Sequence, residues 1–212
     1  MKRTEWIIGI VAGLLISGVV IVFLVLVTSR ADDVEPMDHV AAVRTSDFSG
    51  TTSMQAYELA KEKAIQWHPD ALLITANTTW SQGTTRGDLL TGARSWNLGF
   101  YSPSTSSAAN FEVLADQVKH VNEFALKQSV SPEEVNQWRI DSTVAIYRLL
   151  DEGGDDFLDE YGISTLTMSL MNDDESDRLE WLLLLLGTQA SKTLIMRLDA
   201  STGEVLETLL SN

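Results

Sequence analysis

The side chains that could perform acid–base or metal chemistry include three histidines. His39, His68 and His120 are far apart in the chain and match no metal-binding spacing such as H-E-x-x-H. We therefore expect none of them to be catalytic or to hold a metal ion. His68 precedes Pro69, and because proline cannot continue a helix, we expect a helix to end there.

Carboxylates gather in two short segments, 151–160 and 173–177. Oxygen-rich loops can bind calcium outside cells, although neither segment has the spacing of a calcium-binding EF-hand loop. Paired carboxylates can also hydrolyse glycosides. We expect a solvated acidic face and a polar turn, and the calcium and hydrolase alternatives stay open. The residues concerned are Asp151, Glu152, Asp155, Asp156, Asp159 and Glu160, then Asp173, Asp174, Glu175 and Asp177.

The common catalytic and cofactor-binding motifs are missing from the sequence. There is no G-x-S-x-G nucleophile motif, no phosphate-binding P-loop and no Rossmann glycine pattern. We therefore predict a protein that is not an enzyme and that has no cofactor and no metal site.

The charge balance excludes nucleic acid as an expected partner. The net charge of the chain is −15, and residues 1–30 carry three basic side chains and one acidic one, so residues 31–212 carry −15 − 2 = −17. Such a field repels polyanions. The chain has no cysteine, which excludes disulfides and thiolate metal sites.

The N-terminal region contains an uncharged run from Trp6 to Val27. Twenty-two helical residues span roughly 33 Å, enough to cross a hydrocarbon core of about 30 Å. We predict a transmembrane helix over 6–28, because a cleaved signal peptide would have a shorter apolar region and small residues at its cleavage site. Lys2 and Arg3 precede the run, which favours a cytoplasmic N-terminus over 1–5 and an extracytoplasmic C-terminal part.

Small residues lie on one face of this expected helix. Gly9 and Gly13 form a G-x-x-x-G motif that Ser17 extends, a spacing that lets two helices approach closely. The membrane anchor residues are thus Trp6, Gly9, Gly13, Ser17 and Val27, and the predicted partners include the lipid bilayer and a second copy in a homodimer.

Residues 29–50 have no hydrophobic period and are predicted to be a linker. A helix should then start at Thr52 and Gln55, which match a capping box. Its inner face would be a stripe of alanines, Ala56, Ala60 and Ala64, at intervals of four residues. Period-two alternation predicts strands through Leu72–Ala76, Trp96–Phe100 and Phe111–Ala115, with polar loops between them.

The second half repeats this order. A helix capped by Asp141 or Ser142 and interrupted at Gly153-Gly154 precedes alternating strands over 165–170 and 193–198. The continuous apolar run Trp181–Leu186 predicts a central strand buried on both faces. The expected fold class is therefore α+β, with two tandem helix-plus-antiparallel-sheet units over 51–128 and 129–212.

The second unit resembles PepSY-type domains of bacterial cell-envelope proteins. The resemblance rests on the Gly153-Gly154 break, on Trp181, and on the closing segment Leu198–Val205 with its turn residues Asp199, Thr202 and Gly203. The first unit is similar in layout, with Trp96 placed like Trp181, but it lacks the Thr-Gly pair. The resemblance implies a cystatin-like fold, no catalysis, and an association with peptidases.

Together these patterns predict a non-enzymatic, membrane-tethered protein-interaction module on the extracytoplasmic side of a cell membrane. Its partner would be an extracytoplasmic protein or peptide, and peptidase regulation is the version that the resemblance implies. One alternative is a signalling or assembly subunit that associates through the transmembrane helix. A second alternative is a carboxylate-based hydrolase.

Overall fold

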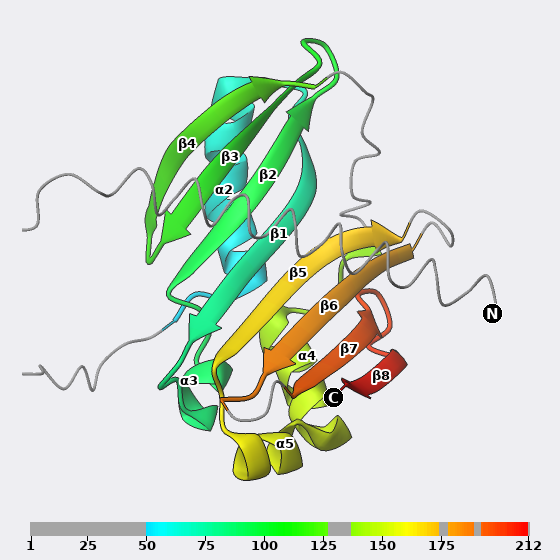
Figure 1. Ribbon diagram of the computed structural model, residues 1–212. Coiled ribbons are helices and arrows are strands. Elements are labelled where there is room, and N and C mark those ends of the chain that lie inside the picture. Colours follow the sequence, from blue (N-terminus) through cyan, green and yellow to red (C-terminus); the bar gives the residue numbers. More distant parts are fainter. Residues whose placement is uncertain (1–49, 127–136, 174–177, 189–191, 212) are drawn as a thin grey trace, which may run out of the picture. The chain divides into compact units, whose positions relative to one another are not determined.

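The computed structural model describes residues 50–126, 137–173, 178–188 and 192–211 (Figure 1). They lie within one compact unit that spans Asp47–Asn212. In chain order its elements are α2 (Ser53–Trp67), β1 (Leu72–Ser81), α3 (Arg86–Leu90), β2 (Ser95–Ser102), β3 (Ser107–Leu114), β4 (Gln117–Ala125), α4 (Ser142–Leu149), the π-helical turn η2 (Leu150–Gly154), α5 (Asp155–Tyr161), β5 (Thr165–Asp173), β6 (Arg178–Leu186), β7 (Thr193–Asp199) and β8 (Val205–Ser211).

The eight strands in the described part of the chain belong to one antiparallel sheet with the order β4-β3-β2-β1-β5-β6-β7-β8. The expected α+β fold with two tandem units is wrong, because β1 and β5 pair along six residues each and join both halves into a single, mostly β structure. Each half nevertheless contributes four consecutive strands, with β1 and β5 at the centre and β4 and β8 at the edges. The expected boundary between 128 and 129 lies outside the described residues.

The expected transmembrane helix over 6–28, including Trp6, Gly9, Gly13, Ser17 and Val27, lies outside the described residues, as does the linker before Gly50. Within the described ranges, no helix has the length and apolar character needed to cross a bilayer. The structure thus gives no support to a single-pass transmembrane protein. The longest described helix, α2, has 15 residues.

Helix α2 forms as its sequence predicts. Thr52 and Gln55 make both hydrogen bonds of the capping box, and His68 is the C-cap. The stripe Ala56, Ala60 and Ala64 is fully buried against the sheet. Because alanine has a small side chain, the helix can lie close to the strands that it covers.

In the first half of the sheet the strand predictions fail at β1 and at β4. In β1 a bulge between Leu73 and Thr75 changes the alternation, so Leu73 and Ala76 are buried while Leu72 is exposed. Strand β4 was not predicted, because an edge strand whose side chains are nearly all exposed has no apolar period. A short helix, α3, also lies within the segment expected to be a loop.

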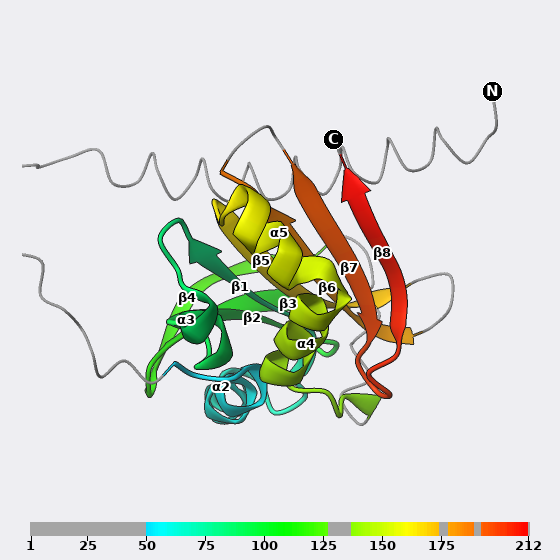
Figure 2. The same cartoon turned by 90° about the horizontal axis from the view of Figure 1, so that it is seen from below.

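The helices cover one face of the sheet, as Figure 2 shows for α2 and α4. The core lies between this face and the helices. It is built by directly opposed residues such as Ala76, Leu98 and Phe111. None of the described helices lies on the opposite surface, which we call the helix-free face.

The N-termini of α2 and α4 meet at the middle of the structure. The backbone N–H of Ser53 donates to Ser142 Oγ at 3.0 Å, and the N–H of Ser142 donates to Ser53 Oγ at 3.1 Å. Asp141 Oδ1 accepts from Ser53 Oγ at 2.7 Å, from Met54 N at 3.2 Å and from Ser142 N at 2.7 Å. One carboxylate therefore satisfies donors at both helix starts, where the helix dipoles are positive.

Candidate functional site

The histidines have structural surroundings where they are described. His68 ends α2, as predicted, and its ring lies 4.5 Å from that of Trp67. His120 on β4 stacks on Phe111 at 5.0 Å between ring centroids. His39 lies outside the described residues. Within the described ranges, no group of three or more His, Asp or Glu side chains is arranged to hold a metal ion.

The first acidic segment lies on η2 and α5, and most of its carboxylates are exposed. Asp155 and Asp159 both pair with Arg86, whose Nε lies 2.6 Å from Asp155 Oδ1 and whose Nη2 lies 3.3 Å from Asp159 Oδ1. These pairs connect α5 to α3. Of the second segment, Asp174, Glu175 and Asp177 lie outside the described residues, and Asp173 ends β5.

The carboxyl groups of Asp70 and Asp88 both have pKa values that are displaced downward. Hydrogen bonds from the Ser102 side chain and the Ser104 backbone lower the pKa of Asp70 to about 2. Hydrogen bonds from Thr85 at the start of α3 lower the pKa of Asp88. A catalytic acid needs the opposite displacement, so these groups do not favour the hydrolase alternative.

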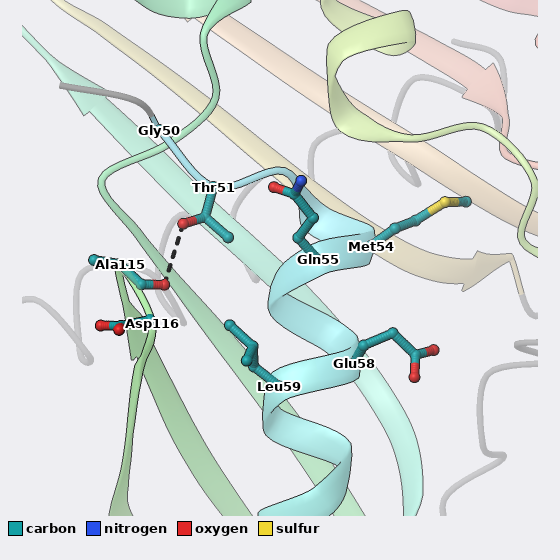
Figure 3. Close-up of a pocket in the computed structure, with 8 residues that line it drawn as sticks. All are labelled: Gly50, Thr51, Met54, Gln55, Glu58, Leu59, Ala115 and Asp116. Atoms are coloured by element: carbon teal, nitrogen blue, oxygen red, sulfur yellow. Dashed lines mark hydrogen bonds between the residues drawn. The ribbon is translucent and has the colours of Figure 1, made fainter. Parts of the chain in front are cut away.

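A groove of about 930 Å³ lies where α2 begins beside the turn between β3 and β4 (Figure 3). Its apolar walls come from Met54, Leu59 and Ala115, and the carboxylates of Glu58 and Asp116 lie beside them. The lining contains no basic side chain; the remaining lining residues are Gly50, Thr51 and Gln55. The groove is open to solvent, and Figure 3 shows the carboxylates of Glu58 and Asp116 pointing away from each other, so they do not form a binding site together.

The two tryptophans that occupy corresponding places in the two expected units are core residues. Trp96 and Trp181 are fully buried, with ring centroids 6.2 Å apart. The indole N–H of Trp96 donates to the carbonyl of Thr51 at 2.8 Å, and that of Trp181 donates to the carbonyl of Ile140 at 2.8 Å. Each tryptophan thus fixes the residue that leads into a helix of its own half.

The turn Asp199–Gly203 has the geometry that its residues predict. Asp199 Oδ1 accepts from the backbone N–H groups of Ser201 and Thr202, both at 2.8 Å, and Gly203 has φ +78°. The carbonyl of Ala200 accepts from Arg139 N and Ile140 N, both at 2.9 Å. The turn therefore holds the segment that leads into α4, which is a structural task.

The helix-free face differs between the two halves. Across β6, β7 and β8 it presents a cluster that we call the leucine face: Leu182, Leu184, Leu186, Ile195 and Leu209. All five are at least partly exposed, and Leu209 is 46% exposed. The expectation that Trp181–Leu186 is buried on both faces is thus wrong, since only the side chains pointing to the helices are covered.

One side of the leucine face is bordered by charges that are largely paired with each other. Glu180 is buried, and its Oε2 lies 2.8 Å from both Nε and Nη2 of Arg197. Arg197 Nη1 lies 3.8 Å from Glu207 Oε2, and Arg178 Nε lies 3.7 Å from Asp199 Oδ2. The acidic excess of the protein is therefore largely offset at this border.

Sequence reasoning did not identify the leucine face, although a signal was present. A run of apolar residues predicts double burial only if something covers both faces of the sheet. The sequence predicts one helical segment before the strands of each half, which is enough to cover only one face of a sheet. A count of available covering elements would have left Leu182, Leu184 and Leu186 without a cover.

Comparisons with known proteins give a single informative likeness. No protein-family model matches the sequence, and no curated protein matches it. The fold is similar to a solved structure from Clostridium difficile 630 described as a "putative lipoprotein", with a TM-score of 0.50 and 11% sequence identity over 79% of this chain and 97% of that one. At this identity the likeness concerns the fold alone.

Proposed function

We propose that this chain is a non-enzymatic, membrane-associated protein of the extracytoplasmic side, whose body binds a protein partner through the leucine face. The observation that carries the proposal is the row Leu184, Ile195 and Leu209, three directly opposed apolar side chains on the face without helices. Exposed apolar patches of this kind mark interaction sites in soluble domains.

The composition of the leucine face favours a protein over a lipid surface. Side chains that bind membrane interfaces combine aromatic rings with lysine or arginine. The leucine face is purely aliphatic, and the bordering Arg197 already pairs with Glu180. The net charge of −15 also opposes binding to anionic lipids. The expected partner therefore presents aliphatic side chains, with basic groups outside the contact.

The extracytoplasmic placement has two supports of different kinds. The solved structure with a similar fold is described as a "putative lipoprotein". Lipoproteins are attached to membranes. The uncharged run Trp6–Val27, with Lys2 and Arg3 before it, supports attachment through the N-terminal region with the body outside. The resemblance to PepSY-type domains makes an extracytoplasmic peptidase the first partner to test.

Site-specific photocrosslinking tests the leucine face. A photoreactive residue at Leu184 should give a discrete protein adduct in intact membranes, whereas one at Thr79 should not. Thr79 is the matched control, because it lies in the same row of the helix-free face, paired through Thr167 to Leu184. Adducts of equal yield at both positions, or adducts with lipid alone, would reject this surface.

A substitution then tests whether the contact matters. Leu184→Asp should abolish copurification of the crosslinked protein, and Thr79→Asp should not, with both variants checked for an unchanged circular dichroism spectrum. If the crosslinked protein is a peptidase, its activity should be measured with and without this chain. A partner without peptidase activity would support the module and reject peptidase regulation.

Sidedness can be tested because the chain has no cysteine of its own. A single cysteine at the exposed position Asn97 should react with a membrane-impermeant maleimide on intact cells. Labelling only after lysis would reject the extracytoplasmic placement.

A further inference from the structure

The two outer strands of the sheet differ in how they are protected. An open edge has unpaired backbone N–H and C=O groups and can pair with another strand, which proteins prevent with charges, bulges or covering elements. Strand β4 carries Lys119, His120 and Glu123 along its nine residues. Glu123 Oε2 accepts from Trp67 Nε1 of α2 at 2.9 Å, and His120 stacks on Phe111. This edge is thus charged and tied to the helix.

Strand β8, at the opposite end of the sheet in Figure 1, carries less charge than β4, and its pairing with β7 has a bulge that leaves Leu206 without a partner on β7. Its seven residues contain no lysine, proline or glycine, and Glu207 is its one charged side chain. Leu209, opposite Ile195, belongs to the helix-free face, and Leu210, opposite Leu194, belongs to the other. They are 46% and 59% exposed. Among the described strands only β7 pairs with β8, so the strand presents leucine on both faces beside an edge that no described strand occupies.

We infer that β8 pairs antiparallel with β8 of a second copy of this chain, which extends the sheet across a twofold axis. An axis through Thr208 places Glu207 opposite Leu209 of the second copy, on the regular part of the strand that follows the bulge at Leu206. No two charged side chains are then directly opposed, and like charges in that position would destabilise the pair. The strand is therefore complementary to itself.

One further observation and one consequence of the pairing favour a second copy over an unrelated peptide. The carboxylate of Glu207 lies 3.8 Å from Arg197 of its own chain, so it does not require a basic residue from a partner. The leucine faces of the two copies would also adjoin at Leu209 and form one larger apolar surface. This goes beyond the proposed function, since the edge of the sheet and not its face makes the contact.

The charge of the protein gives the β8-paired dimer a distinctive dependence on salt concentration. Each copy carries −15, so two copies repel each other at low ionic strength. At about 0.15 M salt the screening length is about 8 Å, and repulsion between distant charges is largely removed. The dimer should therefore become more stable as salt is added, which is opposite to the behaviour of a contact based on ion pairs.

Cysteine crosslinking tests the pairing on the full-length chain in nanodiscs that hold several copies. A cysteine at Thr208 should give a disulfide-linked dimer under mild oxidation, and a mixture of Glu207→Cys and Leu209→Cys chains should crosslink to each other. Asn122→Cys, on the exposed outer strand β4, is the matched control and should stay monomeric. Equal crosslinking at Thr208 and Asn122 would overturn the inference, because it would indicate random collision.

A charge substitution provides a test that does not depend on disulfide geometry. Thr208→Lys places two lysines next to the axis and should raise the dimer dissociation constant severalfold in sedimentation measurements, while Asn122→Lys should leave it unchanged. An unchanged dissociation constant in the Thr208→Lys variant would reject this edge as the contact. Leu184→Asp should retain the Thr208 crosslink, so failure of the proposed partner binding and failure of the dimer can be told apart.

Discussion

Trp96 and Trp181 perform the same task in the two halves of the molecule, each donating its indole N–H to the carbonyl of the residue that leads into a helix. Away from these two tryptophans the halves differ. The helix-free face of β1 and β2 carries Asn77, Thr79 and Asn97, whereas that of β6 and β7 carries leucine and isoleucine. The shared parts specify the fold, and the differing parts are where function should be sought.

The largest expected loss of stability distinguishes the buried face of β6 from its helix-free face. Leu183 is fully buried, so Leu183→Ala should reduce the free energy of unfolding by about 3 kcal/mol through lost burial and a new cavity. Leu184, its neighbour on the leucine face, is already partly exposed. Leu184→Ala should cost less than about 1 kcal/mol. Urea denaturation of both variants is the measurement, and equal losses would show that something covers the leucine face.

The next effect concerns the junction that the halves share. Asp141→Ala should reduce stability by about 2 kcal/mol, because donors at the starts of both α2 and α4 lose their acceptor. Thr52→Ala removes a cap from α2 alone and should cost about 1 kcal/mol. Both values are measured by urea denaturation. A smaller loss for Asp141→Ala than for Thr52→Ala would contradict the role of this carboxylate at both helices.

Substitutions in the β7–β8 turn and in the β3–β4 turn should change the free energy of unfolding in opposite directions. Gly203 has φ +78°, and a Cβ there would lie 3.2 Å from Ile140 Cδ1, so Gly203→Ala should cost about 1–2 kcal/mol. In the other half the turn between β3 and β4 places Ala115 at φ +56°. Ala115→Gly should therefore stabilise the protein by about 0.5–1 kcal/mol. Thermal unfolding of the two variants provides the test, and a shift of the same sign in both would contradict it.

The smallest expected change in stability at neutral pH comes from Asp70 in the N-terminal half, whose contribution to stability depends on acid pH. The pKa of Asp70 is lowered from 3.8 to about 2 by hydrogen bonds from Ser102 and Ser104. Because the folded pKa lies below the unfolded value, the stabilisation is present above pH 4 and is lost as the pH falls from about 4 to about 2. Asp70→Asn should remove this part of the pH dependence of stability. An NMR titration that places the Asp70 carboxyl near pH 4 would contradict the prediction.

Local signals predicted local structure well. The capping box at Thr52 and the alanine stripe placed α2, and the alternation around Trp96 identified the buried face of β2. The helix end at His68 followed from the adjacent proline. These features depend on contacts within a few residues, so a single sequence contains the information needed to find them.

Features that depend on neighbours in space were missed. The exposed strand β4 has no apolar pattern, because its position in the sheet is fixed by hydrogen bonds to β3 and not by burial of its own side chains. The bulge at Leu73 inverted one alternation. The groove near Leu59 and the leucine face are surfaces formed by several elements, and the sequence alone could not assemble them.

The sequence by itself determined where two helices begin, which residues form their inner faces, and that strands follow each helix, because capping and amphipathic period are set by adjacent residues. Tertiary structure alone decided that the two halves share one sheet through β1 and β5. It also decided that the leucines of β6 are covered on one side only. Backbone pairing between strands is nearly independent of side-chain identity, so which edges meet, and which faces stay open, follow from the packing of the whole chain.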